Sequence, residues 1–278
     1  MIFLRSRGTA PARPGRPLAF ARPLAIVFLI LTSVFGLGRE VPARADQEAV
    51  RRTIFVYGNG MERAFIRYVI ELTGKDKPKV CFLPTAAGDD HRVVGYIDAL
   101  CKGLSLEPSI MMTFISSSPG QKSFEEQILG SDAVIVGGGN TLNMLAIWKA
   151  QGIDASLRKA YDRGIVLAGG SAGSLCWFTG GYTDSRPKEL SLMTCLGFLD
   201  YSHSPHYNDG TARKQLYRDA VLKGTLPPGY ACDNGAGLLF VDGRLAEAVT
   251  LDPKSQSYYV HAEDGKLEED PLPAKLIK

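Results

Sequence analysis

Residues 165–178 constrain the fold more than any other stretch, because they read as an apolar run followed by a serine between glycines. The run is typical of a buried strand, and Gly169-x-Ser171-x-Gly173 is typical of a sharp turn from that strand into a helix. Glycine suits such a turn, since its backbone angles strain residues with a Cβ and the strand and helix approach closely. The turn lifts the hydroxyl clear of the backbone, so Ser171 is a candidate nucleophile. An ordinary Gly-Ser loop after a strand is the alternative.

Apolar runs alternate with helical patterns through residues 53–168. Strands are expected at residues 53–57, 79–83, 109–115, 133–136 and 165–168, and helices at 62–72, 91–102, 124–129, 141–150 and 153–163. This alternation implies right-handed βαβ crossovers and a parallel sheet, whose strands are apolar throughout because helices cover both faces. Further along we expect a helix at 211–222, a hairpin over 237–249 and a last strand at 257–261. The sequence predicts an α/β fold, a mainly parallel sheet flanked by helices, with a C-terminal β-hairpin.

The first 45 residues have a composition of their own. Arginines at positions 5, 7, 13, 16 and 22 precede an apolar run at 24–37, which is followed by Ala43-Arg44-Ala45. This order is typical of a cleaved signal peptide, and the run is short for a membrane span, which needs about 20 residues. We predict a signal peptide or targeting extension over residues 1–45 and a single α/β domain over residues 46–278. Export to the periplasm or the exterior follows, with only transient membrane contact. The alternative is an uncleaved extension on a cytoplasmic protein.

Charge and cysteine content exclude some classes of function. The formal net charge of +3 includes the N-terminal arginines, so the folded part is near neutral and gives no indication of nucleic-acid binding. The 5 cysteines are an odd number and lie mostly in apolar runs. They are interpreted as small buried side chains rather than a disulfide framework.

Glycine-rich segments follow three of the predicted strands, where ligands of open parallel sheets bind. They are residues 58–60, residues 137–140 and the turn at Ser171. The second lacks the lysine of a P-loop and the spacing of a dinucleotide fingerprint, so a nucleotide site is not indicated. Its backbone amides could instead form half of an oxyanion hole, with the amide of Ala172 as the other donor.

A nucleophilic serine also needs a base, because a hydroxyl is a poor nucleophile at neutral pH. His206 lies in the polar loop 202–209, ahead of the predicted helix at 211–222, and His203 in the same loop is its rival. A carboxylate would orient the imidazole and stabilise its protonated form. The candidates for that carboxylate are Asp184, Asp209 and Asp233.

With these motifs the sequence resembles the serine peptidases of the dipeptidase E and cyanophycinase group, peptidase family S51. The resemblance covers about residues 53–250 and rests on Val-Gly-Gly-Gly-Asn-Thr at 136–141, Gly-Ser-Ala-Gly at 170–173 and Pro-His-Tyr at 205–207. It implies a class I glutamine amidotransferase-like, flavodoxin-like fold, with Ser171 as nucleophile and His206 as base. It also implies that the amide of Gly138 or Gly139 joins that of Ala172 in the oxyanion hole.

The resemblance bears on the third catalytic residue as well. In dipeptidase E the acid follows the serine turn closely, and Asp184 occupies that place here with a small offset. Cyanophycinases use a later glutamate, but the corresponding segment, Cys-Asp-Asn-Gly at 232–235, has none. Asp184 is therefore the expected acid, and Asp233 is kept in reserve.

The activity implied is acyl transfer without a metal or cofactor, by a serine-type exopeptidase acting on short peptides, including Asp-Xaa dipeptides. An acidic substrate needs a basic contact, and the nearest candidates along the chain are Arg186, Lys188 and Arg213. Two alternatives stay open: cyanophycinase-like hydrolysis of an aspartyl-arginine polymer, and a non-catalytic binding module on the same fold. An α/β-hydrolase esterase is disfavoured, because its histidine normally lies much later in a longer chain.

Overall fold

The computed structural model describes residues 50–278, so the expected targeting segment at residues 1–45 lies outside the described residues. Within the described part, no helix combines the length and the apolar character needed to cross a bilayer. The strands are β1 (Thr53–Tyr57), β2 (Lys79–Leu83), β3 (Glu107–Ile110), β4 (Ala133–Val136), β5 (Val166–Gly170), β6 (Phe178–Thr183), β7 (Ser191–Thr194), β8 (Leu199–Ser204), β9 (Gly229–Cys232), β10 (Ala236–Val241), β11 (Arg244–Thr250), β12 (Ser257–Glu263), β13 (Lys266–Pro271) and β14 (Ala274–Leu276). The helices are α1 (Arg63–Leu72), α2 (His91–Cys101), α3 (Phe124–Leu129), α4 (Thr141–Gln151), α5 (Ile153–Asp162), α6 (Ala172–Leu175) and α7 (Thr211–Leu222), with a 3-10 turn at Thr85–Ala87.

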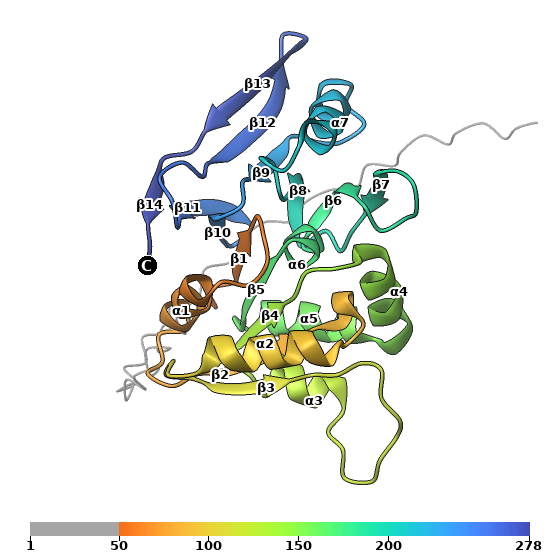
Figure 1. The fold of residues 1–278 in the computed structure, drawn as a ribbon, viewed down its shortest axis with the longest axis vertical. Coiled ribbons are helices and arrows are strands. Elements are labelled where there is room, and N and C mark those ends of the chain that lie inside the picture. The colour runs from red at the N-terminus through yellow and green to blue at the C-terminus, as the bar shows by residue number, and fades with distance from the viewer. Residues whose placement is uncertain (1–49) are drawn as a thin grey trace, which may run out of the picture. The chain divides into compact units, whose positions relative to one another are not determined.

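The larger sheet has the strand order β14-β11-β10-β1-β5-β4-β2-β3 (Figure 1). Its β1, β5, β4, β2 and β3 are parallel, and β10 joins β1 antiparallel to begin the expected hairpin with β11. The fold class predicted from the sequence, a mainly parallel sheet with a later hairpin, is confirmed by this arrangement.

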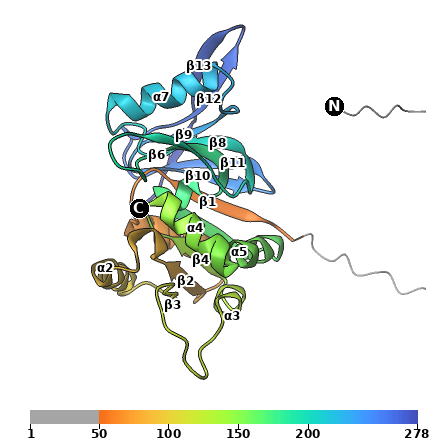
Figure 2. The same cartoon turned by 90° about the vertical axis from the view of Figure 1, so that its right-hand side faces the viewer.

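Helices cover both faces of the parallel strands, and the alternation of side chains along β1 explains how (Figure 2). Ile54 and Val56 belong to one buried cluster with side chains of α4 and α5, such as Trp148. Phe55 and Tyr57 belong to a second cluster with side chains of α1 and α2. Because successive side chains of a strand point to opposite faces, a strand apolar at every position needs a helical layer on each side.

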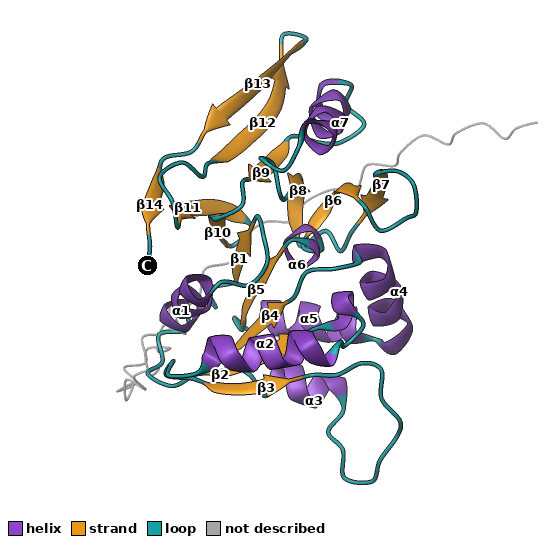
Figure 3. Cartoon of the chain, viewed as in Figure 1, coloured by secondary structure: helices purple, strands orange, loops and turns teal. Residues whose placement is uncertain are grey.

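A second sheet, with the order β13-β12-β9-β8-β6-β7, was not predicted (Figure 3). Its strands carry a weak sequence signal: β6 reads FTGGYT and β13 reads KLEEDP. One segment expectation also needs correction: the strand expected at 109–115 is β3, which spans Glu107–Ile110. The helix that follows the turn at Ser171, α6, has 4 residues before the chain enters β6.

The two sheets bring several strand ends together. In the larger sheet, Tyr57 pairs with Gly170 and Val136 with Gly169, so the loops after β1, β4 and β5 emerge side by side. In the second sheet β8 and β9 are parallel, with Ser204 opposite Ala231. The segments that follow β8 and β9 are therefore neighbours as well, and these segments contain the residues of interest for chemistry.

Candidate active site

Glycines at the end of β5 allow the turn at Ser171 to form. A Cβ on Gly169 would lie 2.2 Å from the carbonyl oxygen of Gly173, and a Cβ on Gly173 would lie 2.2 Å from that of Val136. Non-bonded atoms do not approach this closely, so β4, β5 and α6 can pack together here only because these positions have no side chain.

Ser171 occupies the turn with φ 56° and ψ −118°. A residue with a Cβ rarely adopts a positive φ, so the surrounding hydrogen bonds must hold it. Its amide donates to Tyr57 O at 3.3 Å, and its carbonyl oxygen accepts from the amides of Ser174 and Leu175, both at 3.0 Å. The side chain lines a small cavity of about 160 Å³.

His206 follows β8, and the structure brings it to the serine. Its Nε2 lies 2.8 Å from Ser171 Oγ, across 35 residues of sequence. The backbone of His206 also has a positive φ, 55°, and its amide donates to Gly58 O at 3.1 Å. The histidine side chain is 24% exposed, so the ring is accessible from the cavity.

The second ring nitrogen of His206 contacts the segment that follows β9. Nδ1 lies 2.8 Å from Asn234 Oδ1 and 3.3 Å from Asp209 Oδ2. An amide oxygen can only accept, so Nδ1 carries the proton and donates a hydrogen bond to Asn234 Oδ1. Nε2 is then free to accept the hydroxyl proton of Ser171, which is the tautomer required of a general base.

Asp184 and Asp233, the expected and the reserve acid, both have partners other than His206. The Asp184 side chain is 72% exposed, and its Oδ2 lies 3.4 Å from Arg213 Nη2. Asp233 is buried and accepts from the amide of Gln256 at 3.0 Å, and burial raises the pKa of its carboxyl group. The residue that sequence reasoning missed is Asn234. Asn234 directly follows Asp233, the reserve acid, and its side-chain amide was the available signal.

His203, the rival histidine, lies inside β8 and not in the loop that follows. Its ring stacks on Phe178 with centroids 4.3 Å apart, and its nitrogens lie 2.9 Å from Tyr230 O and 3.0 Å from Ser174 Oγ. Burial lowers its pKa from 6.5 to about 3, so the ring is neutral at neutral pH. Ser174 Oγ also lies 2.7 Å from Ser171 O. His203 thus supports the serine turn through Ser174 and is not at the site itself.

Backbone amides border the serine on the side of the loop after β4. Within residues 50–278 the amides of Gly138 and Gly139 have no protein acceptor, whereas the amides of Gly137 and Asn140 donate to carbonyl oxygens at 3.0 and 2.8 Å. A Cβ on Gly138 would lie 3.4 Å from Ser171 Oγ, so this loop lies against the serine. Ala172 opens α6, and the first amides of a helix have no intrahelical acceptor. All three amides can therefore donate to a bound anion.

The cavity beside Ser171 is polar and carries one charge of each sign. Thr141, Thr183, Asp184 and Arg213 line it together with the serine and histidine. Arg213, from α7, is 13% exposed, and its Nη1 donates to Tyr182 O at 2.9 Å. The guanidinium is thereby fixed beside the serine. Arg186, the other arginine considered from the sequence, instead donates to Ser191 Oγ at 2.9 Å.

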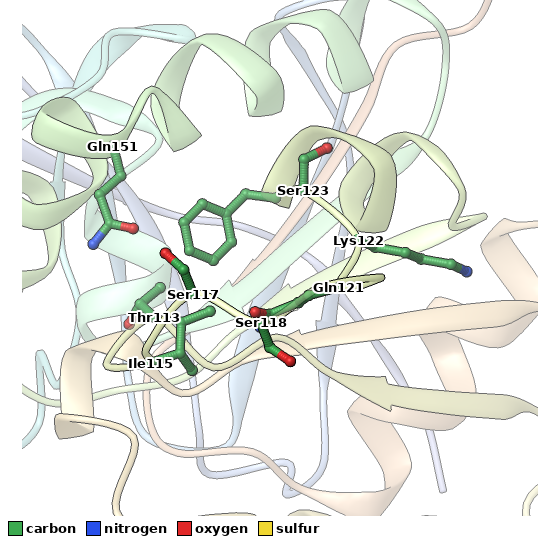
Figure 4. A pocket seen from close by; sticks show the side chains of 9 residues that line it. Thr113, Ile115, Ser117, Ser118, Gln121, Lys122, Ser123 and Gln151 are labelled. Atoms are coloured by element: carbon green, nitrogen blue, oxygen red, sulfur yellow. The ribbon is translucent and has the colours of Figure 1, made fainter.

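A larger hollow of about 410 Å³ lies under the loop between β3 and α3 (Figure 4). Its lining consists mostly of hydroxyl and amide side chains, among them Ser117, Ser118, Gln121 and Gln151. No histidine, aspartate or glutamate is among its nine lining residues, and none of its serines has a histidine partner as Ser171 has in His206. The smaller cavity at Ser171 is the better candidate for catalysis.

Comparison with known proteins identifies the family of this chain. The sequence profile of peptidase family S51 matches residues 54–248. The chain belongs to peptidase family S51. It is 36% identical over 211 residues to the uncharacterized peptidase YgaJ of Bacillus subtilis, covering 76% of this chain and 90% of that one. It is 27% identical to peptidase E of Shewanella denitrificans, covering 75% and 87%. An S51 protein is a hydrolase of peptides, so the chain is a peptidase.

Solved structures show the same fold at low sequence identity. A peptidase from an acI-B1 actinobacterium matches with a TM-score of 0.63 at 16% identity, over 83% of this chain and 98% of that one. A protein assigned as peptidase E from Listeria monocytogenes matches with a TM-score of 0.56 at 19% identity, over 73% and 100%. The α/β architecture expected from the sequence is that of these peptidases.

The buried His203 predicts a pH-dependent stability. Its folded pKa, about 3, lies below the ordinary value of 6.5, so the unfolded chain binds more protons between these values. Stability is therefore full above the unfolded pKa and falls as the pH decreases from 6.5 toward 3. Between about pH 7.5 and about pH 5 we expect this group to account for about 2 kcal/mol.

Urea unfolding at both pH values measures the effect. His203→Gln should be less stable than the wild type near neutral pH but should lose about 2 kcal/mol less on acidification. His91→Gln, at the exposed start of α2, is the matched control, and it should lose as much stability as the wild type when the pH is lowered. An unchanged acid response in His203→Gln would contradict the interpretation.

Proposed function

We propose that this protein is a serine-type exopeptidase that hydrolyses short peptides through an acyl-enzyme, with Ser171 as nucleophile and His206 as general base. The observation that carries the proposal is the 2.8 Å contact between Ser171 Oγ and His206 Nε2. It is supported by the tautomer that Asn234 imposes on the ring and by free amides beside the serine. A nucleophile, a base and oxyanion donors within one cavity are the parts that acyl transfer needs.

The reaction follows from these positions. His206 Nε2 takes the hydroxyl proton while Ser171 Oγ attacks the peptide carbonyl carbon, and the carbonyl oxygen becomes an oxyanion. The amide of Ala172, together with that of Gly138 or Gly139, donates hydrogen bonds to this oxyanion. As the intermediate collapses, the C–N bond breaks and the leaving amine takes the proton from His206. Water, deprotonated by the same nitrogen, then attacks the acyl ester; the C–O bond to Ser171 breaks, the acid product leaves, and Ser171 Oγ takes the proton back from His206.

Asn234 is the third member in this proposal, in place of the Asp184 expected from the sequence. An asparagine can fix the ring and its tautomer as it does in Cys-His-Asn peptidases, but it adds no negative charge. The carboxylate of Asp209, 3.3 Å from the same nitrogen, supplies charge to the imidazolium that forms during catalysis. Its side chain is 59% exposed, so solvent weakens this contribution. Orientation and charge thus come from two residues.

The charges in the cavity suggest the substrate. Arg213 can bind the side-chain carboxylate of an aspartate held at the serine, because the guanidinium presents paired donors. Asp184 can bind the free α-amino group of the same residue. A small cavity with both charges suits an N-terminal aspartate, so we propose Asp-Xaa dipeptides as substrates. An aspartyl-arginine polymer is the competing substrate, and a binding module without catalysis is the competing function.

Labelling with a serine-reactive phosphonate tests the nucleophile. The wild type should be labelled with a stoichiometry near one, while Ser171→Ala should not be labelled and His206→Ala should react at least about 100-fold more slowly, since the base is missing. Ser118→Ala, in the exposed loop between β3 and α3, is the control for loss of a hydroxyl outside the site and should be labelled like the wild type. Intact-mass analysis provides the readout. Persistent labelling of Ser171→Ala would refute the assignment.

Substitution at residues 184 and 234 tests the third member. Asn234→Ala should lower kcat by about 100-fold because the ring loses its orienting acceptor, and Asn234→Asp should stay within about tenfold of the wild type. Asp184→Asn should mainly raise KM, since that carboxylate contacts substrate in this proposal. Steady-state kinetics on Asp-Xaa dipeptides separates the two cases. A large kcat loss in Asp184→Asn alone would show that Asp184 is the acid, as expected from the sequence.

Substrate preference tests Arg213. Arg213→Gln should lower kcat/KM for Asp-Xaa by about 10- to 100-fold, the worth of one charge-assisted contact, and should change kcat/KM for Asn-Xaa by less than about threefold. Arg186→Gln, outside the cavity lining, is the matched control and should leave both values unchanged. If the wild type cleaves the aspartyl-arginine polymer faster than any Asp-Xaa dipeptide, the dipeptidase proposal fails.

A further inference from the structure

The loop that carries His206 and the loop that carries Asn234 are both held by the hairpin of β12 and β13. This hairpin lies beyond residue 248, where the match to the family profile ends. In Figure 1 it stands beside α7, the helix that begins just after the His206 loop. β12 pairs antiparallel with β9, the strand that leads to Asn234.

The first connection runs through Tyr207. Its side chain is 1% exposed, and its hydroxyl donates to Glu269 Oε1 on β13. The ring packs against Tyr258 of β12 and lies under the ammonium of Lys214, 4.4 Å from the ring centroid. Burial and the neighbouring carboxylate raise the pKa of the Tyr207 hydroxyl, so it stays protonated at neutral pH and can donate.

Glu269 is suited to hold this tyrosine. Its side chain is 20% exposed, and its charge is balanced by Lys214 Nζ at 3.5 Å and Arg218 Nη1 at 3.4 Å, both from α7. The carboxylate therefore ties β13 to both α7 and the residue next to the histidine.

The second connection runs through Asp233. Its carboxylate accepts from the amide of Gln256 and its amide donates to the carbonyl oxygen of Gln256, both at 3.0 Å. Gln256 directly precedes β12, and its Nε2 donates to Leu272 O just past β13 at 2.6 Å. The residue before Asn234 is thus fastened to the base of the same hairpin.

The backbone at His206 explains why such anchoring matters. With φ at 55°, His206 is in a conformation that an L-residue leaves unless its surroundings hold it. Its amide and that of Tyr207 donate to the carbonyl oxygens of Gly58 and Cys232, and the Tyr207 side chain is the next restraint along the chain. A shift of about 1 Å in a catalytic group can reduce a rate about 100-fold.

We propose that Glu269 is a positioning residue for catalysis, which fixes the His206 imidazole against Ser171 by holding the Tyr207 hydroxyl. The inference rests on the proposed serine mechanism. It adds to that mechanism a carboxylate on the C-terminal hairpin that touches neither substrate nor reacting atoms.

The test compares variants of Glu269 and of its partner Tyr207 with a control next to Glu269 on β13. Glu269→Ala and Tyr207→Phe should each lower kcat on an Asp-Xaa dipeptide by about tenfold or more, with KM changed less than about threefold, because ring position and not substrate contact is affected. Glu269→Gln keeps an acceptor for the hydroxyl and should retain kcat within about threefold of the wild type. Asp270→Asn is the matched control, since Asp270 pairs with His261 at 3.0 Å, and it should leave kcat unchanged.

Active sites are counted by phosphonate titration, so kcat is expressed per reactive serine and loss of folded protein does not imitate loss of positioning. Thermal melting of each variant reports stability separately. The inference is overturned if kcat per titrated site stays within twofold of the wild type in Glu269→Ala and Tyr207→Phe. It is also overturned if Glu269→Gln loses as much as Glu269→Ala. Failure of the serine mechanism would give different results: the wild type would not be labelled by the phosphonate, or Ser171→Ala would still hydrolyse the dipeptide.

Discussion

The close contact of backbones around Ser171 is the constraint on which the rest of the site depends. A Cβ on Gly170 would lie 2.1 Å from Asn59 O, and a Cβ on Gly58 would lie 2.1 Å from Asp233 O. The loops after β1, β5 and β9 therefore meet without side chains between them. Only because these backbones touch can a serine from one sheet and a histidine from the other lie within hydrogen-bonding distance.

Strain and restraint are paired throughout this region. Ser171 and His206 both have positive φ angles, and both are among the few non-glycine residues of the described part of the chain with that feature. Each is held by backbone hydrogen bonds to β1 or to the loop that follows it, and each is supported by a network of side chains. For the serine this network contains Ser174 and neutral His203. For the histidine it contains Tyr207 and the charges around Glu269.

At His206 the close hydrogen bond and the negative charge come from different residues. The ring nitrogen distal to the serine contacts an uncharged amide at 2.8 Å, and the nearest carboxylate, Asp209, stands slightly further away at 3.3 Å and largely in solvent. Asp184, the acid expected from the sequence, is instead paired with Arg213 in the cavity beside Ser171. The residues that contact the histidine ring are therefore different from the charged pair that lines the cavity.

The local sequence pattern was sufficient to predict the features that depend on residues close together in the chain. The apolar runs and the glycines around Ser171 determined the parallel sheet and the serine turn, because burial on two faces and a strained turn each demand particular residue types in sequence order. The peptidase family also followed from short motifs. Tertiary structure alone decided which side chains meet His206, since Asn234 and Asp209 reach it through the pairing of β8 with β9 and through a turn. Of the second sheet the sequence predicted only the strand at 257–261, because glycines and charged residues interrupt the apolar pattern of strands such as β6 and β13 and the order of strands in the sheet does not follow the chain.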